Sequence, residues 1–242
     1  MKFFIKNGNI ALMDVAEIKK LLSQGYYVHG KIGIIDPIEA LFLMEEKNAK
    51  IFYEGKETDN NLIIKMFHID IKKYYAYKDL KKKGYNFSMM DGSIILKNGE
   101  KMPFFVYSPA DIAFFYGGKG FVSIVDDDFD LTYFIFKIEE PMGSGIQDKN
   151  INFKDQEKQK LFNDLISRKF KLNSGLKFGT EFIAYENNDD AHSTYMVKIL
   201  RHGMQWIELA GLARVANGVK KKLLISTINE NVNYYSFSWF RA

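Results

Sequence analysis

Cysteine is absent from this chain of 242 residues, and its absence excludes several kinds of chemistry. No disulfide can form, no thiol can act as a nucleophile, and no thiolate can bind a metal ion. Such a composition suits a reducing compartment, so we expect a cytoplasmic protein.

Long apolar runs are missing as well. No stretch approaches the roughly 20 residues that a membrane span requires. The first residues, MKFFIKNGNIALMD, show no long apolar core and no small-residue cleavage site, so we expect no signal peptide and no membrane partner. The composition, 47% hydrophobic and 15% aromatic, is that of a folded globular protein.

Arginine is scarce, and its placement is uneven. Residues 1–150 carry 20 Lys and Arg against 21 Asp and Glu, whereas residues 151–242 carry 14 against 9 and hold all four arginines. Arginine presents a planar fork to phosphates and stacks on bases. The basic second part favours a polyanionic partner, although basic surfaces also serve simply to keep a protein soluble.

The spacing of apolar and turn residues predicts an α+β fold that begins with a small domain over residues 1–62. A short strand is expected in NIALMD, followed by helices in DVAEIKKLLSQG and DPIEALFLMEEKNA. The second helix has the stronger start signal, because Asp36 suits the N-cap, Pro37 the first turn, and Glu39 the acidic position of a capping box.

Residues 63–140 are expected to form a second structural unit. The segment MFHIDIKKYYAYKDLKKK predicts a helix that ends at Gly84, and the Asn-Gly pair at 98–99 predicts a hairpin. A second hairpin, over residues 119–141, has an acidic turn. Proline, glycine and polar residues then indicate a linker over residues 141–152.

Residues 153–242 repeat the order of elements found in residues 63–140. The segment 75–88 resembles 161–174, the strand ending at Tyr107 resembles the one ending at Tyr185, and 121–136 resembles 224–239. Between these matches, only the second copy contains a long helix and a histidine. The pattern indicates duplication of one structural unit, followed by decay of the first copy.

Three side chains of the second copy could share one site. GTEFIAY predicts a strand that ends at Tyr185, and HSTYMVKIL predicts a strand that begins at His192, so a turn would bring these residues together. The helix QWIELAGLARVANGVKK ends in basic residues directly before the strand LLISTI. A lysine at this junction could reach the same edge of the sheet.

Such a trio can cleave RNA without a metal ion. The ribose 2′-hydroxyl attacks the adjacent phosphorus while one group accepts its proton, another protonates the departing 5′-oxygen, and a cation stabilises the added negative charge. Histidine suits the proton donor, because its ordinary pKa is about 6.5. Tyrosine, with an ordinary pKa of about 10, needs a nearby lysine that favours phenolate. Plain structural interpretations also stay open: a packed tyrosine, a solvated histidine, and lysines that complement a helix dipole.

The stretch GLKFGTEFIAYENNDDAHSTYMVKIL, followed by LARVANGVKKKLLIS, resembles the catalytic domain of archaeal tRNA-splicing endonucleases. It shares a Lys-aromatic-Gly motif, a tyrosine that closes the next strand, a His-Ser start, and an Arg-Val-Ala helix that ends in a basic pair. GKIGIIDPIEALFLMEE resembles the family's N-terminal domain, and YYAYKDLKKKGYNFS its interdomain helix. The resemblance covers most of the chain and is strongest over residues 173–228.

The resemblance implies a role for each candidate catalytic residue. Tyr185 would be the base, His192 the acid, and Lys221 the cation that stabilises the transition state, with Lys222 as the alternative lysine. The implied reaction uses no cofactor and no metal ion. It cuts precursor tRNA at its intron boundaries and leaves a 2′,3′-cyclic phosphate and a 5′-hydroxyl.

The same resemblance implies how RNA would be recognised. Arg214 matches the arginine that the family stacks on a bulged base, and Arg241 would be its partner near the end of the chain. Lys222 would add a contact to the RNA. A bulge-helix-bulge substrate is expected, because unpaired bases can be splayed and stacked where an A-form groove cannot be read.

The acidic turn implies a mode of assembly. Some family members fuse a degenerate unit to an active one and dimerise through an acidic loop that enters a basic pocket, so a homodimer is expected. The turn VDDDFD carries four acids: Asp126, Asp127, Asp128 and Asp130. Its counterpart INENVN carries one. These acids could also simply solubilise a hairpin tip. The chain is short for a fused member, so a heteromeric assembly stays open.

Two other functions stay open from the residues. One is a non-catalytic RNA-binding or scaffold subunit of a splicing endonuclease complex, but the joint retention of Tyr185, His192 and Lys221 argues against it. The other is a metal-dependent DNA nuclease of similar fold. That enzyme would need clustered acids near a lysine, and the catalytic stretch offers only Asp189 and Asp190.

Overall fold

The computed structural model describes residues 1–30, 32–96, 98–146 and 151–242, and it confirms an α+β protein. The chain forms two compact units. The first consists of Met1–Val106 with Asp127–Leu131 and Ala242, and the second of Tyr107–Asp126 with Thr132–Arg241. Among the described residues, no helix combines the length and the apolar character needed to cross a bilayer.

The first unit opens with a five-stranded sheet in the order β3-β2-β1-β4-β5. β1 (Lys2–Lys6) forms an antiparallel hairpin with β2 (Asn9–Leu12) and pairs in parallel with β4 (Lys50–Tyr53). β3 (Ile34–Ile35) and β5 (Lys56–Glu57) are short edge strands. The strand expected in NIALMD is therefore confirmed, whereas β1 was not predicted.

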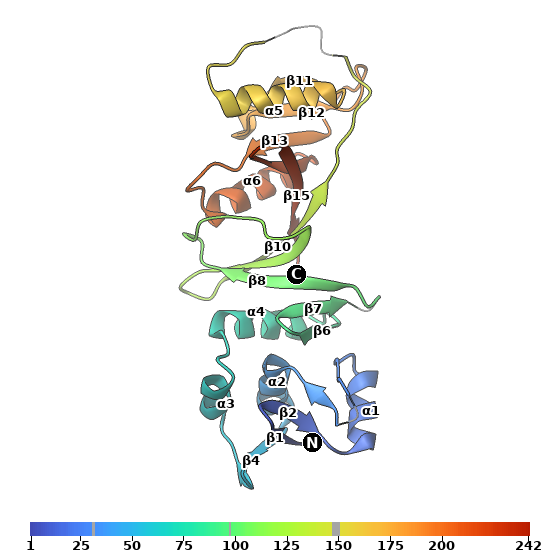
Figure 1. The fold of residues 1–242 in the computed structure, drawn as a ribbon, viewed down its shortest axis with the longest axis vertical. Helices are drawn as coiled ribbons and strands as arrows, with labels where there is room; N and C mark the ends of the chain where they lie inside the picture. The colour runs from blue at the N-terminus through green and yellow to red at the C-terminus, as the bar shows by residue number, and fades with distance from the viewer. Residues whose placement is uncertain (31, 97, 147–150) are drawn as a thin grey trace. The chain divides into compact units, whose positions relative to one another are not determined.

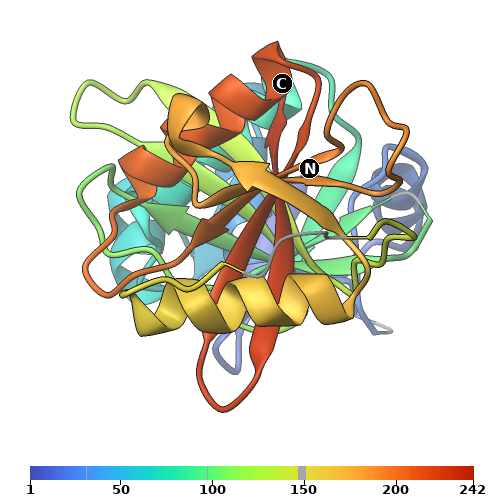
Figure 2. The same ribbon diagram turned by 90° about the horizontal axis from the view of Figure 1, so that it is seen from above.

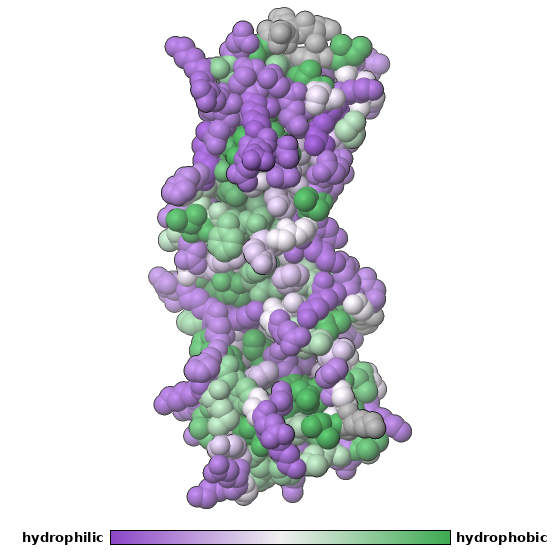
Figure 3. Space-filling model, in the orientation of Figure 1, coloured by the Kyte–Doolittle hydropathy of each residue, from purple (hydrophilic) through white to green (hydrophobic). Residues whose placement is uncertain are grey.

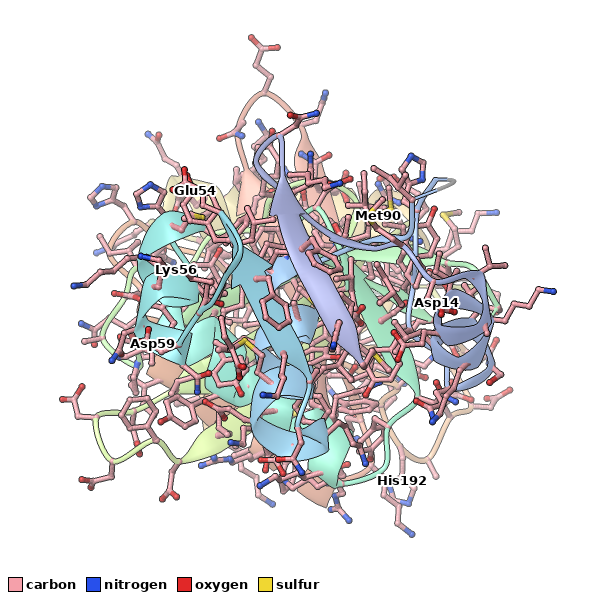
Figure 4. All side chains as sticks on the ribbon, turned by 90° about the horizontal axis from the view of Figure 1, so that it is seen from below. Asp14, Glu54, Lys56, Asp59, Met90 and His192 are labelled. Carbon is pink, nitrogen blue, oxygen red and sulfur yellow. The ribbon has the colours of Figure 1, made fainter. Side chains whose placement is uncertain are left out.

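Two capped helices belong to this sheet. α1 (Val15–Ser23) begins after Asp14, whose carboxylate accepts hydrogen bonds from the Ala16 and Glu17 amides (Figure 4). α2 (Pro37–Lys47) begins after Asp36, as predicted, and Asp36 accepts a hydrogen bond from the Ile38 amide at 2.9 Å. Both starts follow from local sequence, because a cap involves only neighbouring residues.

The capping-box role predicted for Glu39 is wrong. Its side chain is fully buried, and one carboxylate oxygen accepts hydrogen bonds from the Met89 amide at 2.8 Å and the Tyr77 hydroxyl at 3.2 Å. Burial raises the pKa of Glu39 to about 8, because the charged form loses its water. Tertiary packing has recruited this acid in place of the local cap.

The rest of the first unit contains two helices and a meander. The predicted helix before Gly84 is broken at His68, whose φ is 48°, so α3 (Asn60–Met66) and α4 (Ile71–Lys82) are separate helices. β6 (Phe87–Met90), β7 (Ser93–Leu96) and β8 (Lys101–Tyr107) follow as antiparallel neighbours. The β7–β8 hairpin confirms the prediction made from the Asn-Gly pair.

The second unit is a mixed sheet with strands in the order β11-β12-β13-β14-β15-β10-β9 (Figure 1). β9 (Lys119–Val125) and β10 (Leu131–Glu139) form the predicted second hairpin. β11 (Lys171–Ser174), β12 (Phe182–Tyr185) and β13 (Tyr195–Ile199) pair antiparallel in turn. β13 pairs in parallel with β14 (Lys222–Ile228), which pairs antiparallel with β15 (Val232–Phe240).

Two helices cover opposite sides of these strands (Figure 2). α5 (Gln156–Ser167) buries Leu161, Phe162 and Leu165 in a cluster that includes residues of β11 to β15. α6 (Trp206–Gly218) connects β13 to β14 and buries Trp206 and four smaller side chains: Leu209, Ala210, Ala213 and Ala216. Each fully buried large apolar side chain contributes roughly 1.5–3 kcal/mol, so the strand ends between the helices are firmly placed.

The segment expected to be a linker lies partly outside the described residues, because 147–150 are not among them. Residues 141–146 have no regular structure, but the amides of Gly143 and Gly145 donate to the carbonyls of Arg168 and Lys169 at 2.8 and 2.7 Å. This segment therefore runs beside the start of β11. On the face drawn in Figure 3, hydrophilic residues cover most of the region of α5 and β11.

Candidate active site

Strand register aligns the candidate residues in one row across the second unit. Lys171 lies opposite Tyr185, and Ala184 lies opposite Tyr195, so the next residues, Tyr185 and Thr194, also face each other. Tyr195 lies opposite Lys222, which aligns Thr194 with Lys221. Residues that face each other across paired strands point to the same side of the sheet, about 4.8 Å apart from strand to strand.

Tyr185 closes β12, as the sequence predicted. The strand ladder ends there, because the Thr194 amide donates to the Ala184 carbonyl at 3.0 Å and no further pair follows. The Tyr185 side chain is half-buried, and within the described residues its hydroxyl has no hydrogen-bond partner. A phenol with an unoccupied hydroxyl at a strand end can exchange a proton with a bound molecule.

His192 does not begin a strand, in contrast to the prediction. β13 starts only at Tyr195, and His192 lies in the preceding bend, exposed to solvent. In Figure 4 its side chain lies at the edge of the view, outside the ribbon. The chain between Tyr185 and His192 forms a closed turn of its own, so the ladder cannot extend to the histidine. Among the described residues, the imidazole has no hydrogen-bond partner.

The turn after Tyr185 is fixed by its own polar side chains. The Glu186 carboxylate accepts hydrogen bonds from the Thr194 and Tyr195 hydroxyls, both at 3.1 Å. Burial, and then the negative charge of Glu186, raises the pKa of Tyr195 to about 12. The Asn187 amide donates to Asp190 at 2.9 Å, which makes Asp190 a turn-forming residue. In the part of the chain that the structure describes, no three His, Asp or Glu side chains cluster closely enough to hold a metal ion.

Lys221 reaches the backbone beside His192. α6 ends because Lys220 turns left-handed with φ 55°, and the Lys221 amide then donates to the Ala216 carbonyl at 2.9 Å. From this position the Lys221 ammonium donates to the carbonyl of Ser193 at 2.7 Å. Ser193 follows His192 directly and is buried, so the lysine and the histidine lie at one corner of the sheet.

Lys222 faces the other side of the sheet. Its ammonium lies 5.6 Å from the ring centre of Tyr195, which belongs to the core packed against α5. Successive residues of a strand alternate between faces. Of the two lysines that the sequence left as alternatives, the register therefore aligns Lys221 with the row of Tyr185, although both lysines line one pocket.

The two candidate RNA-binding arginines meet at a residue that the sequence did not single out. The guanidinium carbons of Arg214 and Arg241 lie 5.9 and 4.9 Å from the ring centre of Trp239. Leu224 faces Ser236 across β14 and β15, and the same register continued puts Trp239 opposite Lys221. A pocket of about 300 Å³ here is lined by Lys221, Lys222, Trp239 and Glu139, together with residues of α6 and β15. Only the rarity of tryptophan, two in the chain, could have pointed to this position.

The acidic turn is shaped by an aromatic residue within it. Phe129 has φ 61°, and its ring packs edge-on against Tyr75 at 4.9 Å. The Asp127 side chain is fully exposed and lies 3.9 Å from the Lys72 ammonium. An ion pair this long and this exposed contributes little to stability.

Residues 156–234 match the protein family described as tRNA intron endonuclease, catalytic C-terminal domain. The matched range begins with α5 and ends within β15. It therefore includes Tyr185, His192, Arg214 and Lys221, and it ends before Trp239 and Arg241.

Among the curated relatives of this chain are the following three, each named tRNA-splicing endonuclease. The protein of Thermoplasma volcanium is 26% identical over an alignment of 251 positions, gaps included, which covers 84% of this chain and 84% of the relative. The protein of Picrophilus torridus is 39% identical over 75 residues, or 31% of this chain and 26% of the relative. The protein of Pyrococcus abyssi is 28% identical over 128 residues, or 51% of this chain and 69% of the relative.

Proposed function

We propose that this chain belongs to the archaeal tRNA-splicing endonuclease family and cuts precursor tRNA at the boundaries of its intron. We further propose that it acts at a bulge-helix-bulge and needs no metal ion. The observation that carries this proposal is the hydrogen bond from the Lys221 ammonium to the Ser193 carbonyl. It places a cation next to His192, and strand register aligns the same lysine with Tyr185.

The proposed mechanism gives each of the three residues one task. Tyr185 accepts the proton of the ribose 2′-hydroxyl, and the oxygen attacks the adjacent phosphorus. His192 donates a proton to the departing 5′-oxygen, and its exposed position lets it reach a substrate in solution. Lys221 stabilises the extra negative charge on the phosphoryl oxygens. The products are a 2′,3′-cyclic phosphate and a 5′-hydroxyl.

Recognition is proposed to use the arginines near Trp239. A guanidinium stacks on an aromatic face, and an unpaired nucleobase offers such a face. Arg214 and Arg241 both lie within stacking reach of Trp239, so a bulged base could enter between these groups. Lys222, exposed at the start of β14, is proposed to contact the RNA backbone.

The first copy is proposed to be a degenerate unit over residues 63–140, after an N-terminal domain at 1–62 and before a linker at 141–152 and a catalytic domain at 153–242. The pairing of β10 with β15 supports the duplication. Ile135 faces Ser238, and these two residues correspond to each other when 121–136 is aligned with 224–239. Two copies related by a local two-fold axis would pair their last strands in this way.

We propose that two such chains form a homodimer through the acidic turn. The exposed Asp127 carboxylate and the three neighbouring acids suit a basic pocket on a second chain. A two-fold pair is the simplest closed arrangement for a chain with one active and one degenerate unit.

Cleavage of precursor tRNA in EDTA tests the proposed function. The purified chain is incubated with a bulge-helix-bulge RNA and with a fully paired control of the same length. Cleavage of only the bulged RNA, with cyclic-phosphate and 5′-hydroxyl ends, is expected. A strict need for a divalent ion, or 5′-phosphate ends, would exclude this mechanism, and binding without cleavage would favour a scaffold subunit.

A further inference from the structure

Two lysines hold the turn that carries His192 from opposite sides. The Lys221 ammonium donates to the carbonyl of Ser193 at 2.7 Å, and the Lys171 ammonium donates to the carbonyl of Asn188 at 3.2 Å. Both lysines belong to the row of Tyr185, with Lys171 directly across from the tyrosine on β11. The candidate site thus has a second cation on the far side of Tyr185 from Lys221.

Neither of these charges is neutralised by an acid. Within the described residues, Lys171 and Lys221 have no carboxylate at ion-pair distance, and each bonds to a neutral carbonyl. Three other cations of the second unit differ, because each is paired with at least one carboxylate: Arg168 with Asp164 and Glu140, Arg201 with Asp155 and Glu157, and Lys198 with Glu181. An ammonium has three donors, so Lys171 keeps two N–H groups and its full charge for an anion.

Lys171 is placed to bind a phosphate next to the one that is cut, and not the cut phosphate itself. Lys171 and Lys221 are separated by three strand spacings, roughly 14 Å at about 4.8 Å each. The two ammonium groups lie at the carbonyls of Asn188 and Ser193, at either end of the turn that follows Tyr185. From these positions they could contact successive phosphates of one RNA strand that passes over Tyr185.

We propose that Lys171 binds a nonbridging oxygen of the RNA phosphodiester adjacent to the one that is cut. This inference rests on the proposed function, because it needs an RNA strand that passes over Tyr185. Lys171 is a substrate-binding residue in this account, and the proton transfers stay with Tyr185 and His192.

A purely structural role for Lys171 makes a different prediction. If the side chain only ties down the turn at Asn188, a glutamine should serve nearly as well, because its amide N–H can donate to the same carbonyl. If the charge binds phosphate, glutamine should fail and arginine should largely restore binding. Lys171→Gln therefore separates the two roles, and Lys171→Arg is its conservative partner.

Lys160 provides a matched control. Its ammonium also bonds to backbone carbonyls, those of Asn229 and Glu230 at 2.6 and 2.7 Å, but it does so beyond the opposite end of β14. Lys160→Gln thus removes one positive charge and an ammonium that contacts two carbonyls, at a distance from the row. An effect of Lys171→Gln that Lys160→Gln lacks is specific to the site.

The experiment measures binding and single-turnover cleavage of bulged RNA between 50 and 200 mM salt, on the order of the range over which phosphate contacts are lost. Wild type must first cleave the substrate, and its failure to do so would overturn the proposed function and not only this inference. We expect Lys171→Gln to weaken binding about tenfold and to lower the salt slope by about one contact. Lys171→Arg and Lys160→Gln should stay within about twofold of wild type.

Neutral methylphosphonates placed singly at the phosphates flanking the cut identify the contact. When the methylphosphonate stands at the position that Lys171 contacts, wild type and Lys171→Gln should bind the RNA equally well, because that phosphate no longer carries a negative charge. An unchanged salt slope in Lys171→Gln, or a defect that persists at every flanking methylphosphonate, would overturn the proposal.

Discussion

Tyr107 and Tyr185 end corresponding strands in the two copies, but their rings have different surroundings. The Tyr107 ring stacks on Trp206 at 4.6 Å with an interplanar angle of 14°, and Phe114 packs edge-on against it at 5.6 Å. Burial, and then the charge of Asp111, raises the pKa of Tyr107. Tyr185 has an unpartnered hydroxyl among the described residues and lies beside the turn of His192. Tyr107 is thus a packing residue, and Tyr185 is the tyrosine that we propose takes part in the chemistry.

The segments that follow the two tyrosines also differ: one contacts the start of α6, and the other forms the turn that carries His192. After Tyr107, the chain caps the start of α6: the Trp206 and Ile207 amides donate to the carbonyls of Asp111 and Pro109, both at 3.0 Å. The first amides of a helix have no partner within the helix, so these bonds stabilise it. After Tyr185, the chain instead forms the turn that presents His192. Under the proposed duplication, the segment after Tyr107 supports α6, and the corresponding segment after Tyr185 carries the proposed catalytic histidine.

The largest effect should come from the histidine that the first copy lacks. We expect His192→Ala to lower the single-turnover cleavage rate by about 10²–10⁴-fold, the usual contribution of a proton-transfer group. Binding should persist, because His192 is not proposed to hold a phosphate. His202→Ala, at another exposed histidine in a turn, is the control and should cleave normally. Near-normal cleavage by His192→Ala at neutral pH would contradict the assignment.

Removal of a hydroxyl from each tyrosine tests the comparison itself. Tyr185→Phe should lower cleavage by about 10²-fold or more, because phenylalanine cannot accept a proton. Tyr107→Phe keeps the stacked ring and should leave the rate unchanged. Both variants are compared by single-turnover kinetics at one pH. Equal losses of cleavage rate in the two variants would contradict the assignment of a catalytic role to Tyr185 and a packing role to Tyr107.

The sequence predicted the elements better than it predicted the site. Asp36 was correctly expected as a cap, because a cap depends on adjacent residues. Glu39 was not, because its burial depends on Met89 and Tyr77, which are distant in sequence. The strand predicted from His192 failed for a similar reason, since the turn bonds of Glu186 to Thr194 and Tyr195 end the ladder early.

Two features of the site depend on strand register, which sequence spacing does not provide. The choice between Lys221 and Lys222 depends on where α6 ends, and the left-handed turn at Lys220 determines which lysine aligns with the row of Tyr185. Trp239 was missed because only the pairing of β14 with β15 brings it opposite Lys221. In contrast, Tyr185 at a strand end was correctly predicted from alternation alone.

A smaller effect is expected at Arg214, on α6, which has no counterpart in the proposed first copy. Arg214→Lys keeps the charge but loses the flat guanidinium, and a stacking contact contributes about 0.5–2 kcal/mol. We expect bulged RNA to be cleaved several-fold to about 30-fold less well, with little change in salt dependence. Cleavage is measured on two RNAs, one with intact bulged bases and one whose bulge positions are abasic. Arg214→Lys should not change cleavage of the abasic RNA. Wild-type cleavage of the intact RNA by Arg214→Lys would exclude stacking.

The smallest expected effect concerns the acidic turn, where the copies differ as VDDDFD and INENVN. Joint replacement of Asp126, Asp127 and Asp128 by Asn should weaken the proposed dimer about tenfold and depress cleavage at low protein concentration. Exposed charge pairs are screened by salt, so the wild-type dimer should also loosen at high salt. Sedimentation at low and high salt checks both points. An unchanged dimer in the variant would remove the turn from the interface, and a wild-type monomer that cleaves both splice sites would refute the dimer.

A single missing hydroxyl on the substrate tests the central claim most directly, which is that the second copy uses the ribose as the nucleophile. Two bulged RNAs are compared in EDTA, one intact and one with a 2′-deoxy nucleotide directly 5′ of the scissile phosphate. The account predicts cleavage of the intact RNA and no cleavage of the modified RNA at that phosphate, with binding unchanged. Equal cleavage of the two RNAs would mean that water or another group attacks the phosphorus, and it would contradict the roles given to Tyr185, His192 and Lys221.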